Sequence, residues 1–323
     1  MTEILPPRII HNEKLANDFF KANGIVSSYP SVHEQLESVI INRHALKQNG
    51  YNPSIIRHAG RMLMTYRWHF NNTAQTELAI AELNEKFEIK NTNAIRIESD
   101  GQSIEDGRLF IYKNQLHISF VESSWPRMLK CAVKWGLLTE SPNWRVVNIQ
   151  YPTIGQNDGQ HSEKNWIFFQ YEDDLMCLHQ SWPEQIIYNL TKDNAEHRSP
   201  GVRWPYGDIH GDCLMPHQGK LVRFFHSRLN NEISPISWRY YVGCCLMNSR
   251  PPFNTLSVRV SPLIYGSEIC DLSETNRNNV SHYKSNVVFP CGCLEVADGW
   301  WLTVGTNDSG CCLVKIRHED LKL

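Results

Sequence analysis

The sequence predicts an all-β fold: a five-bladed β-propeller preceded by a short N-terminal helical extension. From residue 51 onward, short apolar runs are separated by Gly, Asn, Asp and Pro, which is typical of a chain with many short strands. The chain also repeats a pattern of strand, short polar turn and strand. This pattern begins in residues 52–68, 105–120, 163–180, 211–227 and 287–305. The starts lie about 45 to 75 residues apart, a looser spacing than that of regular propeller families.

The first 50 residues differ in character and are predicted to form the extension, with the propeller domain spanning residues 51–323. Apolar residues in the extension recur at spacings near three and four, which indicates one or two helices. They are Leu15, Phe19, Phe20, Leu36, Val39, Ile40 and Leu46. A β-sandwich is the alternative architecture for the rest. The repeated unit openings favour the propeller, which places them on innermost strands around a central channel.

The second unit shows the strand pattern most clearly. Side chains on a strand alternate between its two faces, and five apolar residues alternate here around a turn at residues 113–115. They are Leu109, Ile111, Leu116, Ile118 and Phe120. The acidic pair Glu105-Asp106 stands directly ahead of this hairpin, so we expect Asp106 at the mouth of a strand.

The composition excludes several classes of function. The 323 residues carry a formal net charge of −2 and a pI near 6.7, so the chain lacks the basic surface that nucleic-acid binding requires. The sequence has no secretory signal pattern and no apolar segment near the ~18 residues of a membrane span, so we expect a cytoplasmic protein. A homo-oligomer is compatible with the sequence.

The ten cysteines lie mostly inside strand-like apolar runs, which favours free thiols in a reducing compartment. Cys291 and Cys293, beside Cys311 and Cys312, are the best zinc candidates. However, the chain has no Cys-x-x-Cys pair, and adjacent cysteines on a strand point to opposite faces. We therefore expect no metal and no cofactor.

Polar residues stand at or just before the first strand of four of the five units. They are Asn52 and Ser54, then Glu105, Asp106 and Arg108, then Glu163, Lys164 and Asn165, and finally Asp212. A propeller brings corresponding positions of all blades to one axis. The sequence therefore predicts one pocket of acids, bases and amides, a mixture that suits the hydroxyls of a sugar. Tryptophans such as Trp204 and Trp300 could contact sugar rings but more often belong to a core.

These residues carry a resemblance. In order, Asn52-Pro53-Ser54, Tyr66-Arg67, Glu105-Asp106-x-Arg108, Lys164-Asn165, Phe225-His226 and Asp308 resemble the motifs of glycoside hydrolase family 130. This family of five-bladed propellers includes β-mannoside phosphorylases and β-1,2-mannosidases, and related mannosyltransferases share the propeller. The resemblance implies a carbohydrate-active enzyme that cleaves or forms β-mannosidic or similar linkages with inversion, with phosphorolysis or its reverse as the leading reaction. Hydrolysis, mannosyl transfer and a non-catalytic sugar- or protein-binding propeller stay open as alternatives.

The resemblance also implies roles for single residues. Asp106 would be the general acid, in a motif that usually reads Glu-Asp-Pro-Arg and here has Gly107 in place of proline. The sugar-binding residues would be Asn52, Ser54, Arg67, Arg108, Asp212 and Asp308. Lys164 and His226 would bind phosphate as co-substrate, with an oligosaccharide or sugar phosphate as partner. Arg108 could instead be a structural partner of Glu105.

The chemistry of inversion fits one carboxylic acid opposite an incoming nucleophile. The acid protonates the leaving oxygen while the nucleophile attacks the other face of the ring. In a phosphorylase the nucleophile is phosphate, and cations must hold it. A hydrolase instead needs a carboxylate base about 6.5–9.5 Å from the acid, for which Glu163, Asp208 and Asp212 are the candidates.

Overall fold

The structure is a computed structural model of the chain. It describes residues 36–41, 45–46, 50–69, 75–98, 103–124, 130–157, 161–231, 234–265, 287–321 and 323. Within this part of the chain, no helix is long and apolar enough to cross a membrane.

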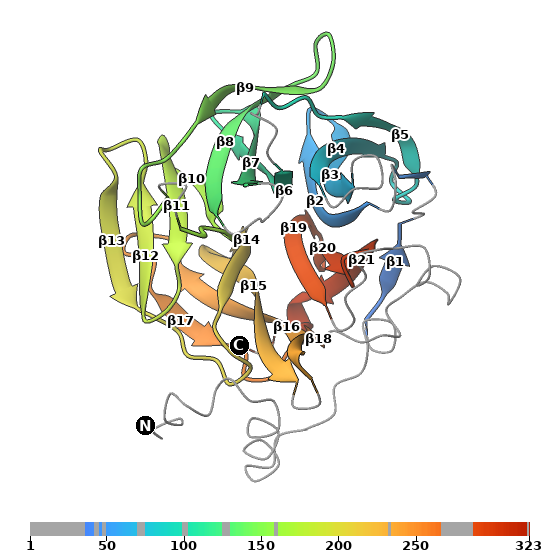
Figure 1. The fold of residues 1–323 in the computed structure, drawn as a ribbon. Helices are drawn as coiled ribbons and strands as arrows, with labels where there is room; N and C mark the ends of the chain where they lie inside the picture. The colour runs from blue at the N-terminus through green and yellow to red at the C-terminus, as the bar shows by residue number, and fades with distance from the viewer. Residues whose placement is uncertain are drawn as a thin grey trace.

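The described strands form five antiparallel sheets arranged in a ring (Figure 1). Blade 1 contains β2 (Tyr51–His58), β3 (Arg61–His69), β4 (Thr76–Leu83) and β5 (Ile89–Ala94). Blade 2 contains β6 (Ser103–Tyr112), β7 (Gln115–Ser123), β8 (Cys131–Thr139) and β9 (Arg145–Gln150). Blade 3 contains β10 (Ile167–Tyr171), β11 (Asp174–Gln180), β12 (Glu184–Asn189) and β13 (Ala195–Pro200).

The last two blades contain one variation each. Blade 4 contains β14 (His210–His217), β15 (Lys220–Asn231), β16 (Ser234–Asn248) and β17 (Thr255–Val258), with β18 (Ile264–Tyr265) also paired to β16. Blade 5 contains β19 (Val288–Val296), β20 (Gly299–Thr306), β21 (Gly310–Arg317) and, outermost, β1 (Ser38–Ile40). The innermost strands β2, β6, β10, β14 and β19 are the predicted unit openings, so the five-bladed propeller is confirmed.

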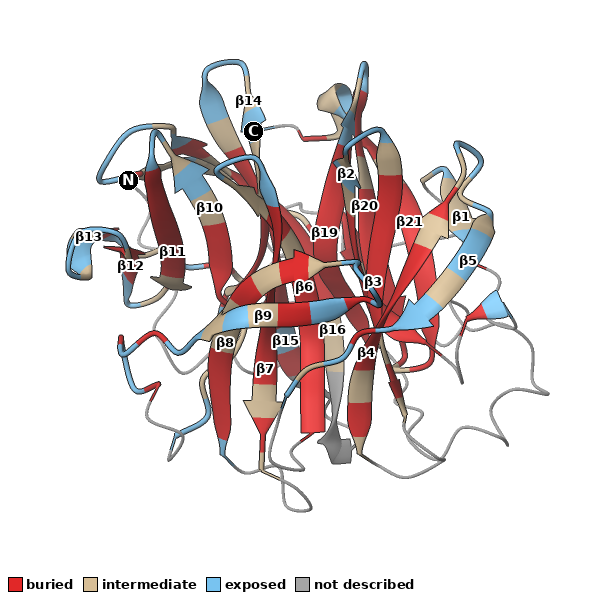
Figure 2. Cartoon of the chain, turned by 90° about the horizontal axis from the view of Figure 1, so that it is seen from above, coloured by how far each residue is buried: buried red, intermediate tan, exposed pale blue. Residues whose placement is uncertain are grey.

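The core consists of apolar layers between neighbouring blades. Leu63 and Ile80 of blade 1, for example, pack with Ile118 and Phe120 of blade 2. Similar clusters join the other four pairs of neighbours around the ring. Figure 2 shows that buried residues concentrate on inner and middle strands, whereas the outer strands β5, β9 and β13 are largely exposed. These layers join each blade to its neighbours around the ring.

The predicted hairpin of blade 2 is confirmed, with one change in its turn. Tyr112 pairs with Gln115, so the turn consists of Lys113 and Asn114 alone. Both have positive φ, 50° and 58°, as a two-residue hairpin turn requires. The acidic pair lies inside strand β6 rather than ahead of it.

The segment predicted as helical differs where it is described. Ser38–Ile40 form strand β1, which pairs with β21 so that Ser38 opposes Val314 and Ile40 opposes Cys312. The helix expected there is wrong for these three residues. β-branched residues suit a strand, and the free edge of β21 offers unpaired backbone groups, so long-range pairing overrides the local pattern. Leu15, Phe19 and Phe20 lie outside the described residues.

Nine of the ten cysteines belong to the described part of the chain, where all nine are free and buried. Cys270 lies outside it. In the same described ranges, no group of three or more His, Cys, Asp or Glu side chains is placed to hold a metal ion.

Candidate functional site

β-Bulges shape the inner strands near the start of four blades. The pairing registers shift between Tyr51 and Ser54, Glu105 and Arg108, Gly211 and Cys213, and Pro290 and Gly292. Each bulge adds one residue to the inner strand and redirects a side chain. Asn52 and Asp106 occupy the first two bulges with φ of 51° each, a conformation that Asn and Asp tolerate better than most residues. The sequence motifs therefore correspond to bulged backbone.

Gly107, which stands in place of a proline, packs closely against blade 1. A Cβ added there would lie 2.6 Å from Cδ1 of Leu78 and 3.1 Å from Cδ1 of Ile118. The glycine thus fills a tight position directly after Asp106 and allows the two blades to approach each other.

A cavity of about 710 Å³ opens at the end of the channel where these bulges lie. All five blades contribute to its wall. It brings together six of the predicted site residues: Asn52, Arg67, Asp106, Lys164, His226 and Asp308. Ser54, Arg108 and Asp212 do not line it.

Asp106 presents one carboxylate oxygen to this cavity. Oδ1 accepts a hydrogen bond from Nδ2 of Asn52 at 2.8 Å and lies 3.5 Å from Nη1 of Arg67. Oδ2 forms no hydrogen bond with any described residue and is not fully enclosed, although the side chain is only 10% exposed. The carboxyl is therefore held through one oxygen and open to a ligand through the other.

Glu105 points to the neighbouring cations. Its Oε2 lies 2.7 Å from Nζ of Lys164 and 3.3 Å from Nη1 of Arg67, and its Oε1 accepts a hydrogen bond from Ser123. Burial acts to raise the pKa of Glu105, but Arg67 and Lys164 outweigh it and lower this pKa to about 2. Glu105 is therefore an ionised anchor for both cations, which sequence reasoning did not foresee.

Lys164 lines the cavity while it is paired with Glu105. Burial acts to lower its pKa, but Glu105 and Asp106 outweigh this effect and raise it. The ammonium group is charged and has three donors, of which Glu105 engages one. The prediction that Lys164 binds phosphate stays a prediction.

Arg108 and Asp212 lie deeper in the channel, where both line a second, more apolar cavity of about 510 Å³. Arg108 donates to Oδ1 of Asp212 at 3.1 Å and to the carbonyl of Gly211 at 2.6 Å. The suggested pairing of Arg108 with Glu105 is therefore replaced by a pairing with Asp212. Asp212 in turn accepts from Nδ1 of His226 at 2.8 Å.

Of the other two predicted sugar ligands, one forms a buried contact between blades and the other lines the cavity. Ser54 is fully buried, and its Oγ accepts a hydrogen bond from the backbone N–H of Leu109, so it joins blades 1 and 2. Asp308 lies in the turn between β20 and β21 with φ of 51° and lines the cavity.

The three candidate bases have different surroundings. Glu163 accepts from the backbone N–H of Gln156 and from Nε1 of Trp166, and lies 3.4 Å from Nε2 of His179. These contacts overcome burial and lower its pKa. Both carboxylate oxygens of Asp212 are engaged, as described above. Asp208 is exposed at the cavity wall.

Blade 4 adds cavity residues that the sequence analysis missed. His210 stacks on His226 with ring centroids 5.0 Å apart. Burial lowers the pKa of His210 to about 3, and nearby arginines act in the same direction, so His210 is neutral at pH 7. Arg228 and Tyr240 also line the wall. His210 directly precedes the predicted fourth unit, so its position was the available signal.

Among the described residues, Trp182 is the tryptophan that lines this cavity. The guanidinium of Arg203 lies 4.5 Å from the centre of its ring. Trp204 and Trp300, which were prominent in the sequence, are buried in the core.

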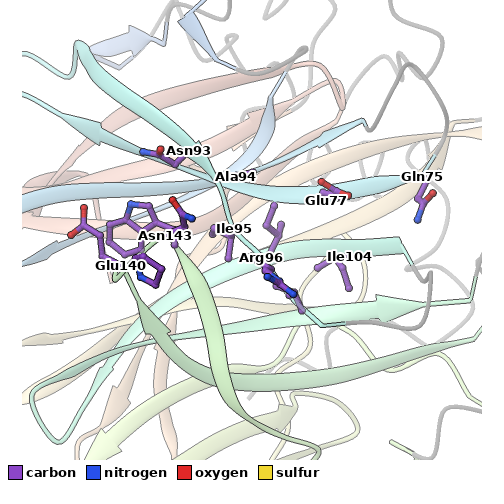
Figure 3. Close-up of a pocket in the computed structure, with 13 residues that line it drawn as sticks. Gln75, Glu77, Asn93, Ala94, Ile95, Arg96, Ile104, Glu140 and Asn143 are labelled. Atoms are coloured by element: carbon purple, nitrogen blue, oxygen red, sulfur yellow. The ribbon is translucent and has the colours of Figure 1, made fainter.

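A separate groove of about 650 Å³ lies between blades 1 and 2 (Figure 3). Its wall includes Glu77, Asn93, Arg96, Glu140 and Asn143. None of the predicted site residues lines it.

Neither a family model nor a curated relative matches the sequence. Among solved structures, a GH130 glycoside hydrolase that targets beta-1,2 mannosidic linkages in Candida mannan matches with a TM-score of 0.61 and 13% identity, over 84% of this chain and 85% of its own. The beta-1,2-mannobiose phosphorylase of Listeria innocua, bound to beta-1,2-mannobiose, matches with a TM-score of 0.63 and 13% identity, over 92% and 94%.

A third similar structure is that of an enzyme with a different reaction. The GDP-Man-dependent mannosyltransferase of Leishmania mexicana matches with a TM-score of 0.58 and 11% identity, over 94% of each chain. A hydrolase, a phosphorylase and a transferase thus share this architecture, and a fold alone does not fix a reaction. The chain has the five-bladed propeller fold of the GH130 mannoside phosphorylases and of the proteins built like them.

Proposed function

We propose that this protein is a carbohydrate-active enzyme that acts on β-mannosidic or similar linkages with inversion, by phosphorolysis or its reverse. The observation that carries the proposal is the carboxyl of Asp106. It occupies a bulge on the innermost strand, its Oδ1 is held by Asn52, and its Oδ2 opens to the axial cavity. A single carboxylic acid in this position is what an inverting reaction requires as proton donor.

The sugar would lie between Asp106 and the neighbouring polar groups. Arg67 is fixed by Glu105 and by Oγ1 of Thr76, which accepts from its Nε at 3.1 Å. With Arg67 held and Asn52 bound to the acid, their remaining donors and Asp308 could bind the hydroxyls of one mannosyl unit. Preorganised groups of this kind bind without rearrangement when the bond breaks.

The cavity favours phosphate over water as the nucleophile. Cations at its wall, Lys164 and Arg228, could hold an anion. Hydrolysis needs a free carboxylate base, but the oxygens of Glu163 and Asp212 are engaged by other residues. Asp208 is the candidate base that leaves hydrolysis open.

The proposal includes inorganic phosphate as co-substrate and an oligosaccharide or sugar phosphate as partner, with no metal cofactor. The nine free, buried thiols suit a reducing compartment, which favours the cytoplasm.

A synthetic assay tests the proposal. Purified protein is mixed with mannose 1-phosphate and a panel of acceptor sugars, and released phosphate is measured. We expect release that depends on the acceptor and is lost in Asp106→Asn. Cleavage of β-mannobiose without phosphate would assign hydrolysis instead, and turnover of GDP-mannose would assign mannosyl transfer. Sugar binding without turnover in all three assays would make the propeller a non-catalytic binder.

A further inference from the structure

Three buried side chains form a continuous contact chain beneath the axial cavity. Arg108 binds Asp212, and Asp212 binds His226 through both carboxylate oxygens, at 2.9 and 2.8 Å from Nδ1. The three residues are 7%, 2% and 3% exposed. They connect the inner strands of blades 2 and 4 to the second strand of blade 4.

The ring of His226 is held in one orientation. His210 stacks on it at 5.0 Å, and Tyr240 lies nearly parallel to it at 5.7 Å. Phe289 of blade 5 contacts it with ring centroids 4.6 Å apart. Aromatic neighbours on several sides therefore resist rotation of the imidazole away from Asp212.

These contacts determine which nitrogen of His226 carries the proton in the neutral ring. A carboxylate at Asp212, paired with Arg108, can only accept hydrogen bonds. Nδ1 must therefore be the donor, and Nε2 of a neutral imidazole is then an acceptor. Nε2 has no hydrogen-bond partner among the described residues and is not fully enclosed, so this lone pair opens to the cavity.

We propose that His226 makes the anion subsite selective for an oxyanion that carries its own proton, with Asp212 and Arg108 as positioning residues. This inference rests on the proposed function, because it concerns the phosphate of that reaction. Monohydrogen phosphate can donate its P–OH to Nε2, while Lys164 and Arg228 hold other oxygens. Sulfate has no proton at neutral pH, so its oxygen lone pairs would face the lone pair of Nε2.

Such an arrangement selects against an anion that would leave Nε2 without a hydrogen-bond partner. A site built around one hydrogen bond rejects a ligand of similar shape that lacks the partner. Sulfate and monofluorophosphate have nearly the size of phosphate but are unprotonated dianions at pH 7.5. Arsenate is protonated in the same way as phosphate. These four anions differ chiefly in the property that Nε2 would sense.

The test measures binding of the four anions to the whole protein by calorimetry at pH 7.5. We expect phosphate and arsenate to bind with similar affinity, and sulfate and monofluorophosphate about tenfold more weakly or worse. Equal binding of phosphate and sulfate would overturn the inference and leave phosphorolysis standing. If none of the four anions binds, both the inference and the proposed phosphorolysis are overturned. Selective binding in a protein without phosphorolytic turnover would support the inference and refute only the proposed reaction.

Asp212→Asn provides a second test. The amide of the new side chain can donate to Nδ1, which would move the ring proton to Nε2 and turn the acceptor into a donor. We expect the preference for phosphate over sulfate to shrink or reverse. Nitrogen-15 NMR of the histidines in the unaltered protein tests the tautomer even if this variant does not fold. A protonated Nε2 in the neutral wild-type ring would contradict the inference.

Discussion

The axial cavity and the groove between blades 1 and 2 have similar sizes, about 710 and 650 Å³, but differ in construction. The axial cavity receives side chains from all five blades, and its central polar groups Arg67, Glu105 and Asp106 are largely enclosed and lie close to one another. The Asp106 side chain is 10% exposed, whereas the Glu140 side chain in the groove is 55% exposed. The volume of a cavity alone therefore does not identify a functional site. Polar side chains that are largely buried, held in place and still able to form further hydrogen bonds do identify one.

The largest expected effect is the loss of the proton donor. Asp106→Asn preserves the shape of the side chain and still allows the hydrogen bond from Asn52, but it removes the transferable proton. Turnover should therefore fall by about 10²–10⁴-fold. Thermal unfolding should change little, which circular dichroism can check. Asn93→Ala, in the groove, is the matched control. Equal loss of turnover in both variants would remove the distinction between the two regions.

Removal of Arg108 tests the buried ion pair. Arg108→Met leaves the Asp212 carboxylate without its cation in a buried place, which should lower the free energy of unfolding by about 3–5 kcal/mol. The comparison is Glu140→Gln, which breaks the exposed pair with Arg61 and should cost about 0–1 kcal/mol. Urea unfolding of both variants gives the two values. A smaller cost for Arg108→Met than for Glu140→Gln would show that the axial network does not stabilise the fold.

Glu105 should make the stability of the axial site depend on acid. Its pKa is about 2 in the folded chain against an ordinary value of 4.5. Because folding lowers this pKa, the stabilisation is complete above about pH 4.5 and is lost as the pH falls toward 2. Glu105→Gln should therefore be less stable than wild type at pH 7, with the gap closing in acid. Thermal melts across this range measure the gap, and a gap that stays constant would contradict the assignment.

The smallest expected effect belongs to the groove itself. Its residues Asn93 and Asn143 are exposed, so replacing both by alanine should change the free energy of unfolding by no more than about 0.5 kcal/mol. Turnover should be unchanged. A marked loss of oligosaccharide turnover, with turnover of short substrates retained, would instead make the groove part of the binding surface.

The fold could be predicted from the sequence because its signals are local. Alternation of apolar residues and a two-residue turn define the hairpin around Lys113 and Asn114, and the unit openings repeat. The same openings indicated where Asn52, Asp106 and Lys164 gather. Repetition along the chain becomes proximity once the ring closes.

The contacts within the site depend on long-range geometry and could not be read from the sequence in the same way. Arg108 and Asp212 are 104 positions apart, and nothing near Arg108 distinguishes this partner from the adjacent Glu105. Whether a polar residue at an opening faces the cavity, as Asp106 does, or joins two blades, as Ser54 does, depends on the bulges. The strand β1 (Ser38–Ile40) likewise depends on a distant edge rather than on its own pattern.

The pairing of β1 with β21 means that segments from opposite ends of the described chain share one hydrogen-bonded sheet. Blade 5 therefore combines strands from both ends of the described chain. A circular permutant that joins the original ends by a flexible linker and opens the chain at the exposed turn after Tyr112 would keep every blade intact. Deleting Ser38–Ile40, by contrast, would remove the outermost strand of blade 5 and leave the edge of β21 free to pair with another molecule.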